Sequence, residues 1–147
     1  MAILPEDLLE ESAETEAEEE EFTGYRESIA FDGTDFVRDG ANRLVGSNGL
    51  EAYEDWCRTC LATEKDSLFC YPSDFGIDTS DIAFATSRGE VESILTKEIT
   101  DALMADSYHR TESIEDINFE WGESDSVEVE ISVNGIEEMT IDLSVTI

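Results

Sequence analysis

The sequence predicts an α+β domain, an antiparallel sheet with two main helices packed on one face, preceded by an acidic arm. Two patterns indicate this class. Apolar residues recur at helical spacing in the middle of the chain, and they alternate with polar residues over the last third. Such alternation is typical of antiparallel strands that bury one face. The 147 residues suffice for one domain with its own core, which we expect over residues 25–147.

Two short strands are expected ahead of the helices, over Tyr25–Phe31 and Phe36–Val45. Residues 32–35, which separate them, read Asp-Gly-Thr-Asp, a composition typical of tight turns. Residues 69–80 contain a proline and a glycine and lie between the two helical patterns, so we expect a loop there.

Both expected helices begin with the pattern of a capping box, a polar residue followed three positions later by glutamate. Asn48 and Glu51 open the first helix, which should run to about Glu64, and Ser87 and Glu90 open the second. The apolar stripe of the first helix is Leu50, Tyr53, Trp56, Cys57, Cys60 and Leu61. That of the second is Val91, Ile94, Leu95, Ile99, Ala102 and Leu103. Each helix therefore has one face that can cover a sheet.

Three strands are expected in the last third, around residues 117–121, 127–133 and 139–147. Asn134-Gly135 lies between the last two strands and predicts a two-residue hairpin turn, because both central residues of a type I′ turn need positive φ. Ile136 breaks the alternation that follows, which predicts a bulge beside the turn.

The charge is strongly negative, with 38 acidic and 8 basic side chains and a net charge of −30. Nucleic acids and anionic membranes carry the same sign, so the charge argues against electrostatic binding to either. We also expect no membrane span and no signal peptide. Only two residues are lysine, and this composition suits either a salt-adapted host or a partner with a basic surface.

The first 24 residues hold ten acidic side chains and no basic one. Their apolar cluster, which includes Leu4 and Leu8, is spaced so that a short helix would present it on one face. Two interpretations stay open for this arm. It is either a solubilising tail or a docking peptide that becomes ordered on a partner, with Leu4 and Leu8 as contacts.

The three cysteines raise the question of thiol or metal chemistry. Cys57 and Cys60 form a CxxC motif about two turns inside the expected helix, whereas redox cysteines lie at a helix N-terminus. Their place on the apolar stripe favours buried structural cysteines. Cys70 and His109 would complete a zinc set, but the spacing matches no common zinc finger. We therefore expect no catalytic residue, no metal and no cofactor.

The last expected strand alternates up to Ile147, and Asp142 is its only charged residue. One interpretation places it in the centre of the domain's own sheet. The other makes it an edge strand that pairs with a neighbouring subunit through main-chain hydrogen bonds. The candidate interface residues on it are Ile141, Leu143, Val145 and Ile147.

Several short motifs occur together in the order found in one protein family. They are Asp39-Gly40, Arg43–Gly46, Asn48–Ala52, Thr63-Glu64, Tyr71 and Phe75–Asp78, followed by the second helix and the final hairpin. Over roughly residues 25–147 the chain resembles the XkdS-type baseplate proteins of contractile phage tails. The wider family includes the lysozyme-like wedge protein of T-even phages and baseplate subunits of type VI secretion machines.

The resemblance implies a structural role without hydrolysis. Members of the family sit in the baseplate wedge next to the tube and present strands that mimic a sheath subunit, so that the first sheath ring can join. The implied partners are other baseplate wedge proteins, the tail sheath protein and tube or hub proteins. The implied location is a virion tail baseplate assembled in the host cytoplasm, with several copies set by the symmetry of the machine.

One loop departs from the family pattern. Many members carry Arg-Pro-Glu-Phe-Gly after a Glu-Arg pair and use it to grip the wedge core. Residues 71–76 here read Tyr-Pro-Ser-Asp-Phe-Gly, with one extra residue and a tyrosine in place of the arginine. The charged grip is therefore not carried over. Tyr71, Pro72, Phe75 and Gly76 are kept as interface candidates, and their alternative roles are loop geometry and core packing.

The resemblance, together with the possible edge strand, implies a baseplate wedge subunit that starts sheath assembly by strand exchange. An acidic mimic of nucleic acid that inhibits a DNA- or RNA-binding protein is the alternative from another class. A thiol or zinc enzyme using Cys57, Cys60 and Cys70 is a third interpretation.

Overall fold

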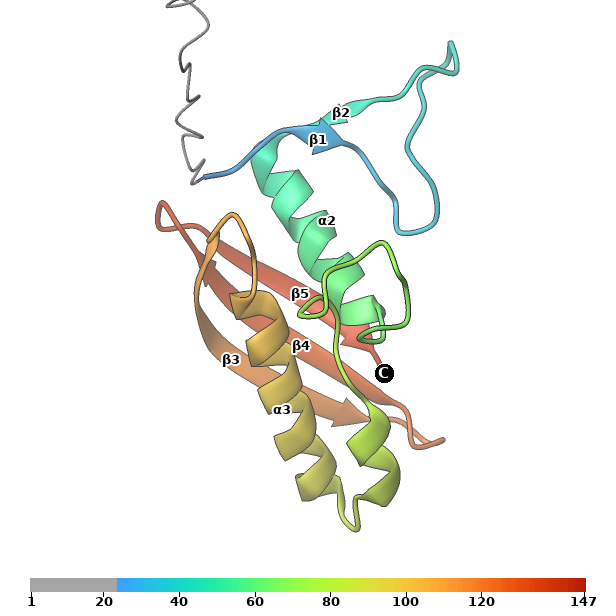
Figure 1. Ribbon diagram of the computed structural model, residues 1–147, viewed down its shortest axis with the longest axis vertical. Helices are drawn as coiled ribbons and strands as arrows, with labels where there is room; N and C mark the ends of the chain where they lie inside the picture. Colours follow the sequence, from blue (N-terminus) through green and yellow to red (C-terminus); the bar gives the residue numbers. More distant parts are fainter. Residues whose placement is uncertain (1–23) are drawn as a thin grey trace, which may run out of the picture.

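The computed structural model describes residues 24–147, and these form an α+β fold (Figure 1). Leu4 and Leu8 of the predicted arm lie outside the described residues. The elements in chain order are β1 (Ser28–Ile29), β2 (Gly46–Ser47), α2 (Gly49–Ala62), the 3₁₀ helix η1 (Ser80–Phe84), α3 (Arg88–Met104), β3 (Thr111–Trp121), β4 (Val127–Gly135) and β5 (Thr140–Thr146). The predicted fold class is confirmed.

The main sheet is antiparallel, with the strand order β3-β4-β5, and α2 and α3 lie across one of its faces (Figure 1). β4 is the central strand and alternates strictly between buried and less buried residues. Its buried residues meet those of the two helices in one core, whose fully buried members include Tyr53, Cys57, Cys60, Leu95, Ile99, Leu103, Val129, Ile131 and Val133. Burial of each such aliphatic side chain contributes roughly 1.5–3 kcal/mol, so this shared core holds the helices to the sheet.

Both predicted helix starts are confirmed, with one difference in the caps. The Asn48 side chain accepts a hydrogen bond from the N–H of Glu51, and the Glu51 carboxylate accepts one from the N–H of Asn48, which completes a capping box. At α3 the Ser87 hydroxyl accepts from the N–H of Glu90, but the Glu90 carboxylate accepts from the N–H of Thr86 instead. In α3, therefore, the glutamate side chain bonds to the residue before the N-cap and not to the N-cap itself.

The strands predicted before α2 are much shorter than expected. Ser28 and Ile29 pair with residues 47 and 46, and only isolated bridges join the residues between. Two aspartates explain the interruption. The carboxylate of Asp32 accepts from the backbone N–H groups of residues 34 and 35, and that of Asp39 accepts from those of residues 41 and 43. These side chains close two tight turns, so the backbone cannot continue as a regular ladder.

The hairpin between β4 and β5 turns later than the sequence predicts. Asn134 and Gly135 lie inside β4, and the N–H of Gly135 donates to the carbonyl oxygen of Met139 at 2.7 Å. The turn residues are Glu137 and Glu138, which have φ angles of 60° and 58°. The prediction of a turn at Asn134-Gly135 is therefore wrong by three residues, although both central residues of the real turn have the positive φ that the prediction required.

The glycine at position 135 meets a packing requirement instead. A Cβ on Gly135 would lie 3.1 Å from the carbonyl oxygen of Arg110 and would also collide with the hydroxyl of Tyr25. The same hydroxyl donates to the carbonyl oxygen of Ile136 at 2.7 Å, which ties the start of the described chain to this corner. The predicted bulge at Ile136 is wrong as well, because the register of β4 with β5 is regular and the register shifts fall between β3 and β4.

Candidate functional site

β5 forms one edge of the main sheet, with β4 as its neighbour and no second strand beside it among residues 24–147. The interpretation that places this strand in the centre of the domain's own sheet is therefore wrong for the described part of the chain. Its register with β4 runs without a shift from Thr140 to Thr146. A regular edge strand presents a row of unpaired N–H and C=O groups, which is a template for another strand.

The hydrogen-bond pattern shows which residues of β5 offer these groups. Val127 and Ile147 each donate an N–H to the carbonyl oxygen of the other, at 3.1 and 2.9 Å. Because such pairs alternate along an antiparallel ladder, the odd-numbered residues of β5 bond to β4 and the even-numbered residues direct their backbone groups away from it. The outward set is Thr140, Asp142, Ser144 and Thr146.

The apolar residues that sequence analysis named on this strand have another environment. Ile141 and Leu143 are buried in the domain's own core, and Val145 and Ile147 are half-buried against it. Their side chains hold β5 to the helices, so a contact at this edge would use the backbone of the alternate residues. Sequence analysis missed that set, although the same alternation could have identified it once the strand was taken as an edge.

The opposite edge of the sheet is built differently. β3 has register shifts after Thr111 and after Ile114, which bend the strand away from a regular ladder. It also carries four acidic residues, Glu112, Glu115, Asp116 and Glu120. Bulges and charges are the means by which proteins protect edge strands from pairing. β5 has no register shift, and Asp142 is its only charged residue, so it is less protected against pairing than β3.

Residues 71–76 form a compact loop against α2. The rings of Tyr71 and Phe75 stack with their centroids 4.2 Å apart, and Phe75 packs edge-on against Trp56 at 6.0 Å. The carbonyl oxygen of Pro72 accepts a hydrogen bond from the N–H of Phe75 at 3.1 Å. Phe75 is buried whereas Tyr71 is exposed, so Phe75 has a core role and Tyr71 is the residue of this pair that a partner can reach.

Gly76 is required by the backbone at the end of this loop. Its φ of 96° is unfavourable for other residues, and a Cβ there would lie 2.6 Å from the carbonyl oxygen of Thr63. Its N–H donates to the sulfur of Cys60 at 3.4 Å. Gly76 therefore joins the loop to the core beneath α2.

Cys57 and Cys60 are both fully buried, as predicted for structural cysteines. Burial raises the pKa of the Cys57 thiol to about 12 and raises the pKa of the Cys60 thiol as well. A reactive cysteine needs a lowered pKa and access to solvent, and these two have neither. Cys70 is exposed on the loop, and no group of three or more potential metal ligands gathers within residues 24–147.

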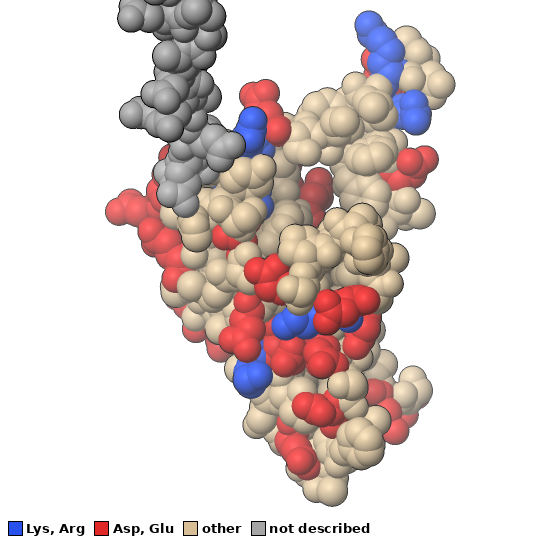
Figure 2. All heavy atoms as spheres, viewed as in Figure 1, with Lys and Arg blue, Asp and Glu red and all other residues tan. Residues whose placement is uncertain are grey.

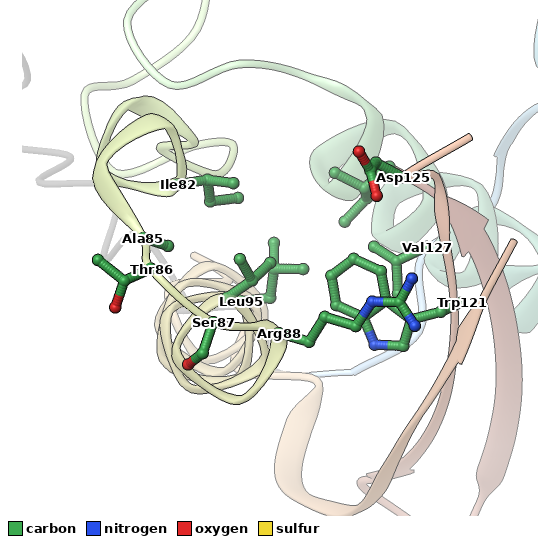
Figure 3. Close-up of a pocket in the computed structure, with 11 residues that line it drawn as sticks. Ile82, Ala85, Thr86, Ser87, Arg88, Leu95, Trp121, Asp125 and Val127 are labelled. Atoms are coloured by element: carbon green, nitrogen blue, oxygen red, sulfur yellow. The ribbon is translucent and has the colours of Figure 1, made fainter. Parts of the chain in front are cut away.

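A recess of about 530 Å³ lies between η1, the start of α3 and the turn that joins β3 to β4 (Figure 3). Figure 3 shows the Arg88 side chain lying over the ring of Trp121, and the guanidinium carbon is 4.8 Å from the ring centroid. The indole N–H of Trp121 donates to Glu92 at 2.8 Å. The other walls include the apolar residues Ile82, Leu95 and Val127 together with polar side chains such as Ser87 and Asp125, so this recess is of mixed polarity.

A family model for the contractile injection system sheath initiator matches residues 27–138, which is well over half of the chain. The chain belongs to this family. Its role therefore lies in the assembly of the sheath of a contractile injection system, where a sheath initiator interacts with sheath and baseplate components. A search of curated proteins finds no match. No helix in the described part of the chain is long and apolar enough to cross a membrane.

The family match agrees with the resemblance to contractile tail baseplates, and the narrower XkdS-type wedge assignment stays a prediction. The matched range ends just before β5 begins at Thr140. The possible use of β5 as a pairing edge therefore rests on the sheet topology and on the hydrogen-bond pattern, independently of the match.

Proposed function

We propose that this sheath initiator is a structural subunit of the baseplate wedge and starts the sheath by strand exchange at β5. The observation that carries the proposal is the regular β5 edge of the main sheet, beside which no further strand lies within residues 24–147, opposite an edge interrupted by register shifts. A strand from a subunit of the first sheath ring would add beside β5 and extend the sheet from three strands to four. Main-chain hydrogen bonds would supply the affinity, and the alternating side chains would fix the register.

The energetics favour this edge over other surfaces. The four outward residues of β5 offer an N–H and a carbonyl each, and a net hydrogen bond is worth about 0.5–1.5 kcal/mol. Asp142 is the only charge on β5, so an incoming strand meets little repulsion there despite the net charge of −30. Ile141 and Leu143 anchor β5 to the core, which means that the template is rigid before the partner arrives.

The rest of the acidic surface would face other components of the machine. Figure 2 shows acidic side chains spread over the body of the domain. Basic patches on wedge proteins and on tube or hub proteins would complement it, and the symmetry of the baseplate would set the number of copies. The protein would then work in the tail baseplate of a virion or related machine, assembled in the host cytoplasm.

Replacing Ser144 with proline tests the strand exchange directly. The N–H of Ser144 points away from β4, so Ser144→Pro removes a donor from the free edge without breaking a bond of the domain's own ladder. Ser144→Ala is the matched control, because it loses the same hydroxyl hydrogen bond to Glu128 but keeps the N–H. A truncation before β5 would be a poorer test, since it would remove Ile141 and Leu143 from the core.

The measurement is co-purification of the sheath protein of the same machine, and nucleation of sheath rings, after circular dichroism shows that each variant is folded. We expect folded Ser144→Pro to lose sheath capture and Ser144→Ala to retain it. Equal capture by both variants would place the sheath contact elsewhere. Absence of sheath binding by the unaltered chain would instead favour the acidic inhibitor, which predicts tight, salt-sensitive binding to a nucleic-acid-binding protein.

A further inference from the structure

A groove of about 750 Å³ opens between two projecting segments on one side of α2. One is the segment from β1 to β2, residues 28–47, here called the ribbon. The other is the loop of residues 71–75. Figure 1 shows the ribbon and the loop that follows α2 on the same side of that helix, and Figure 2 shows the surface hollowed beside the ribbon. Neither feature is used by the strand exchange proposed at β5.

The walls of the groove are aromatic and partly exposed. The ribbon contributes Phe31 and Phe36, whose rings meet edge-on at 5.8 Å, and Phe36 is 49% exposed. The loop contributes Tyr71, which is 38% exposed, and α2 contributes Trp56 at the floor. Within the described part of the chain, Phe36 and Tyr71 thus stay partly exposed on two separate segments that face the same open groove. Exposed apolar surface of this kind marks an interaction site.

The floor of the groove is rigid. Arg110 lies there and donates to the carboxylate of Asp106 through Nε at 2.7 Å and Nη2 at 3.0 Å, with both residues buried. Its guanidinium carbon also lies about 5 Å from the ring centroids of Tyr53, Trp56 and Tyr108. The charge of Arg110 is therefore neutralised within the domain, and the aromatic rings around it are held in place before any partner binds.

The other charged side chains that line the groove favour a positively charged occupant. Its lining includes the carboxylates of Glu27 and Asp74, and that of Asp55, which pairs with Arg58 at 3.8 Å, against one further cation, Arg26. The domain around it, residues 25–147, carries 28 acidic and 8 basic side chains. The chain's own first 24 residues, with ten acidic side chains and no basic one, have the wrong sign to settle there. A second copy of the chain has the same disadvantage.

We propose that the aromatic groove binds a segment of a partner protein that carries large apolar side chains next to lysine or arginine. The apolar side chains enter between Phe36 and Tyr71 and reach Trp56, and the basic side chains meet the carboxylates of the rim. The ribbon forms the second wall of this groove, so recognition does not depend on the loop of residues 71–75 alone. The site is independent of the sheath contact, and the two can be lost separately.

The test is a selection of short displayed peptides from a random library on the full-length protein, followed by sequencing of the enriched peptides. We expect them to combine two or more large apolar residues with a net positive charge. Their binding should fall at least about tenfold on the double variant Phe36→Ser, Tyr71→Ser, because aromatic anchors dominate such interfaces. The control is Phe84→Ser, which removes an aromatic side chain that is 82% exposed and lies outside the groove.

Several results would overturn the proposal. Enrichment of acidic peptides, of peptides that bind the double variant as tightly as the unaltered chain, or of no peptide at all would each do so. Tighter binding by the full-length variant Leu4→Ser, Leu8→Ser would show that the chain's own first residues occupy the groove. Self-association that is lost in the Phe36→Ser, Tyr71→Ser variant would assign the groove to a second copy. Equal melting temperatures of all variants establish that they are folded.

Discussion

The thiol of Cys57 shows at the scale of one residue how burial decides between chemistry and packing. Its spacing to Cys60 is that of a redox motif, yet its side chain is fully buried and its pKa is about 12. The hydroxyl of the adjacent Tyr53 is within 2.6 Å of the Thr111 hydroxyl, so this part of α2 is bonded to the sheet. Position on the apolar stripe predicted the role of Cys57, because a helix has only one face to bury.

The raised pKa of Cys57 predicts how stability depends on pH. A thiol in the unfolded chain ionises near pH 9, whereas Cys57 in the folded protein stays protonated to about pH 12. The unfolded state therefore releases its proton first, and the free energy of unfolding falls as the pH rises between these values, by roughly 3–4 kcal/mol at most. The stabilisation is complete below pH 9. The measurement is urea unfolding at a series of alkaline pH values.

Cys57→Ala should reduce the slope of this profile, whereas Cys70→Ala, which removes an exposed thiol, should leave it unchanged. A profile of the same slope in Cys57→Ala would show that another group causes the loss. Cys60 is the first such group, because burial raises the pKa of its thiol from the same ordinary value. Burial also raises the pKa of Tyr53, but its ordinary pKa is higher and its effect begins at a higher pH.

The hairpin from β4 to β5 shows at the scale of an element what local sequence can and cannot specify. The turn uses Glu137 and Glu138, two residues that take positive φ only at a cost. The dipeptide Asn134-Gly135, which resembles a turn sequence, lies inside the strand instead. It packs there against Tyr25 and Arg110, which are distant in sequence. The cost at the turn is offset by these tertiary contacts.

Replacing the real turn with favourable residues should stabilise the protein. Glu137→Asn with Glu138→Gly supplies the dipeptide that a type I′ turn prefers, and we expect a gain of about 1 kcal/mol. The melting temperature should rise by about 2–4 °C. Gly135→Ala is the contrasting variant and should destabilise the protein, since its Cβ would crowd the Arg110 carbonyl. The opposite pair of results would place the turn at Asn134-Gly135 after all.

The elements that the sequence predicts well are those with local causes. Both helices begin at the predicted caps, because an N-cap is decided by a side chain and a backbone N–H three residues apart. The alternation of β4 and β5 is equally local. The short β1 and β2, the register of the hairpin and the groove over α2 depend on contacts between distant residues. No periodicity in a single sequence reports those contacts.

At the scale of the whole molecule the charge of −30 is the dominant feature. The eight basic residues can neutralise only a small part of the 38 carboxylates, and several of the ion pairs are exposed, such as Arg58 with Glu54 at 3.6 Å. Exposed pairs contribute little to stability. Repulsion among the remaining carboxylates therefore opposes the compact state, and salt screens it.

Stability should accordingly rise with salt. We expect the free energy of unfolding to increase by at least about 1 kcal/mol between low and molar sodium chloride, because the screening length shortens from about 30 Å to about 3 Å over such a range. Urea unfolding at each salt concentration measures this. The effect should shrink near pH 4, where the carboxylates gain protons. A stability that is independent of salt at neutral pH would show that the acidic surface imposes no cost on folding.

The two edges of the main sheet differ, so the sheet has one side that favours strand pairing and one that does not. A sheet with two regular edges could be extended on both sides, but here β3 has register shifts and four acidic residues, while β5 is in regular register and has one charged residue. If strand exchange occurs at β5 as proposed, strands would be added on that side only. A nucleus that grows on a single side would produce a polar assembly, in which the first copy is always at the same end.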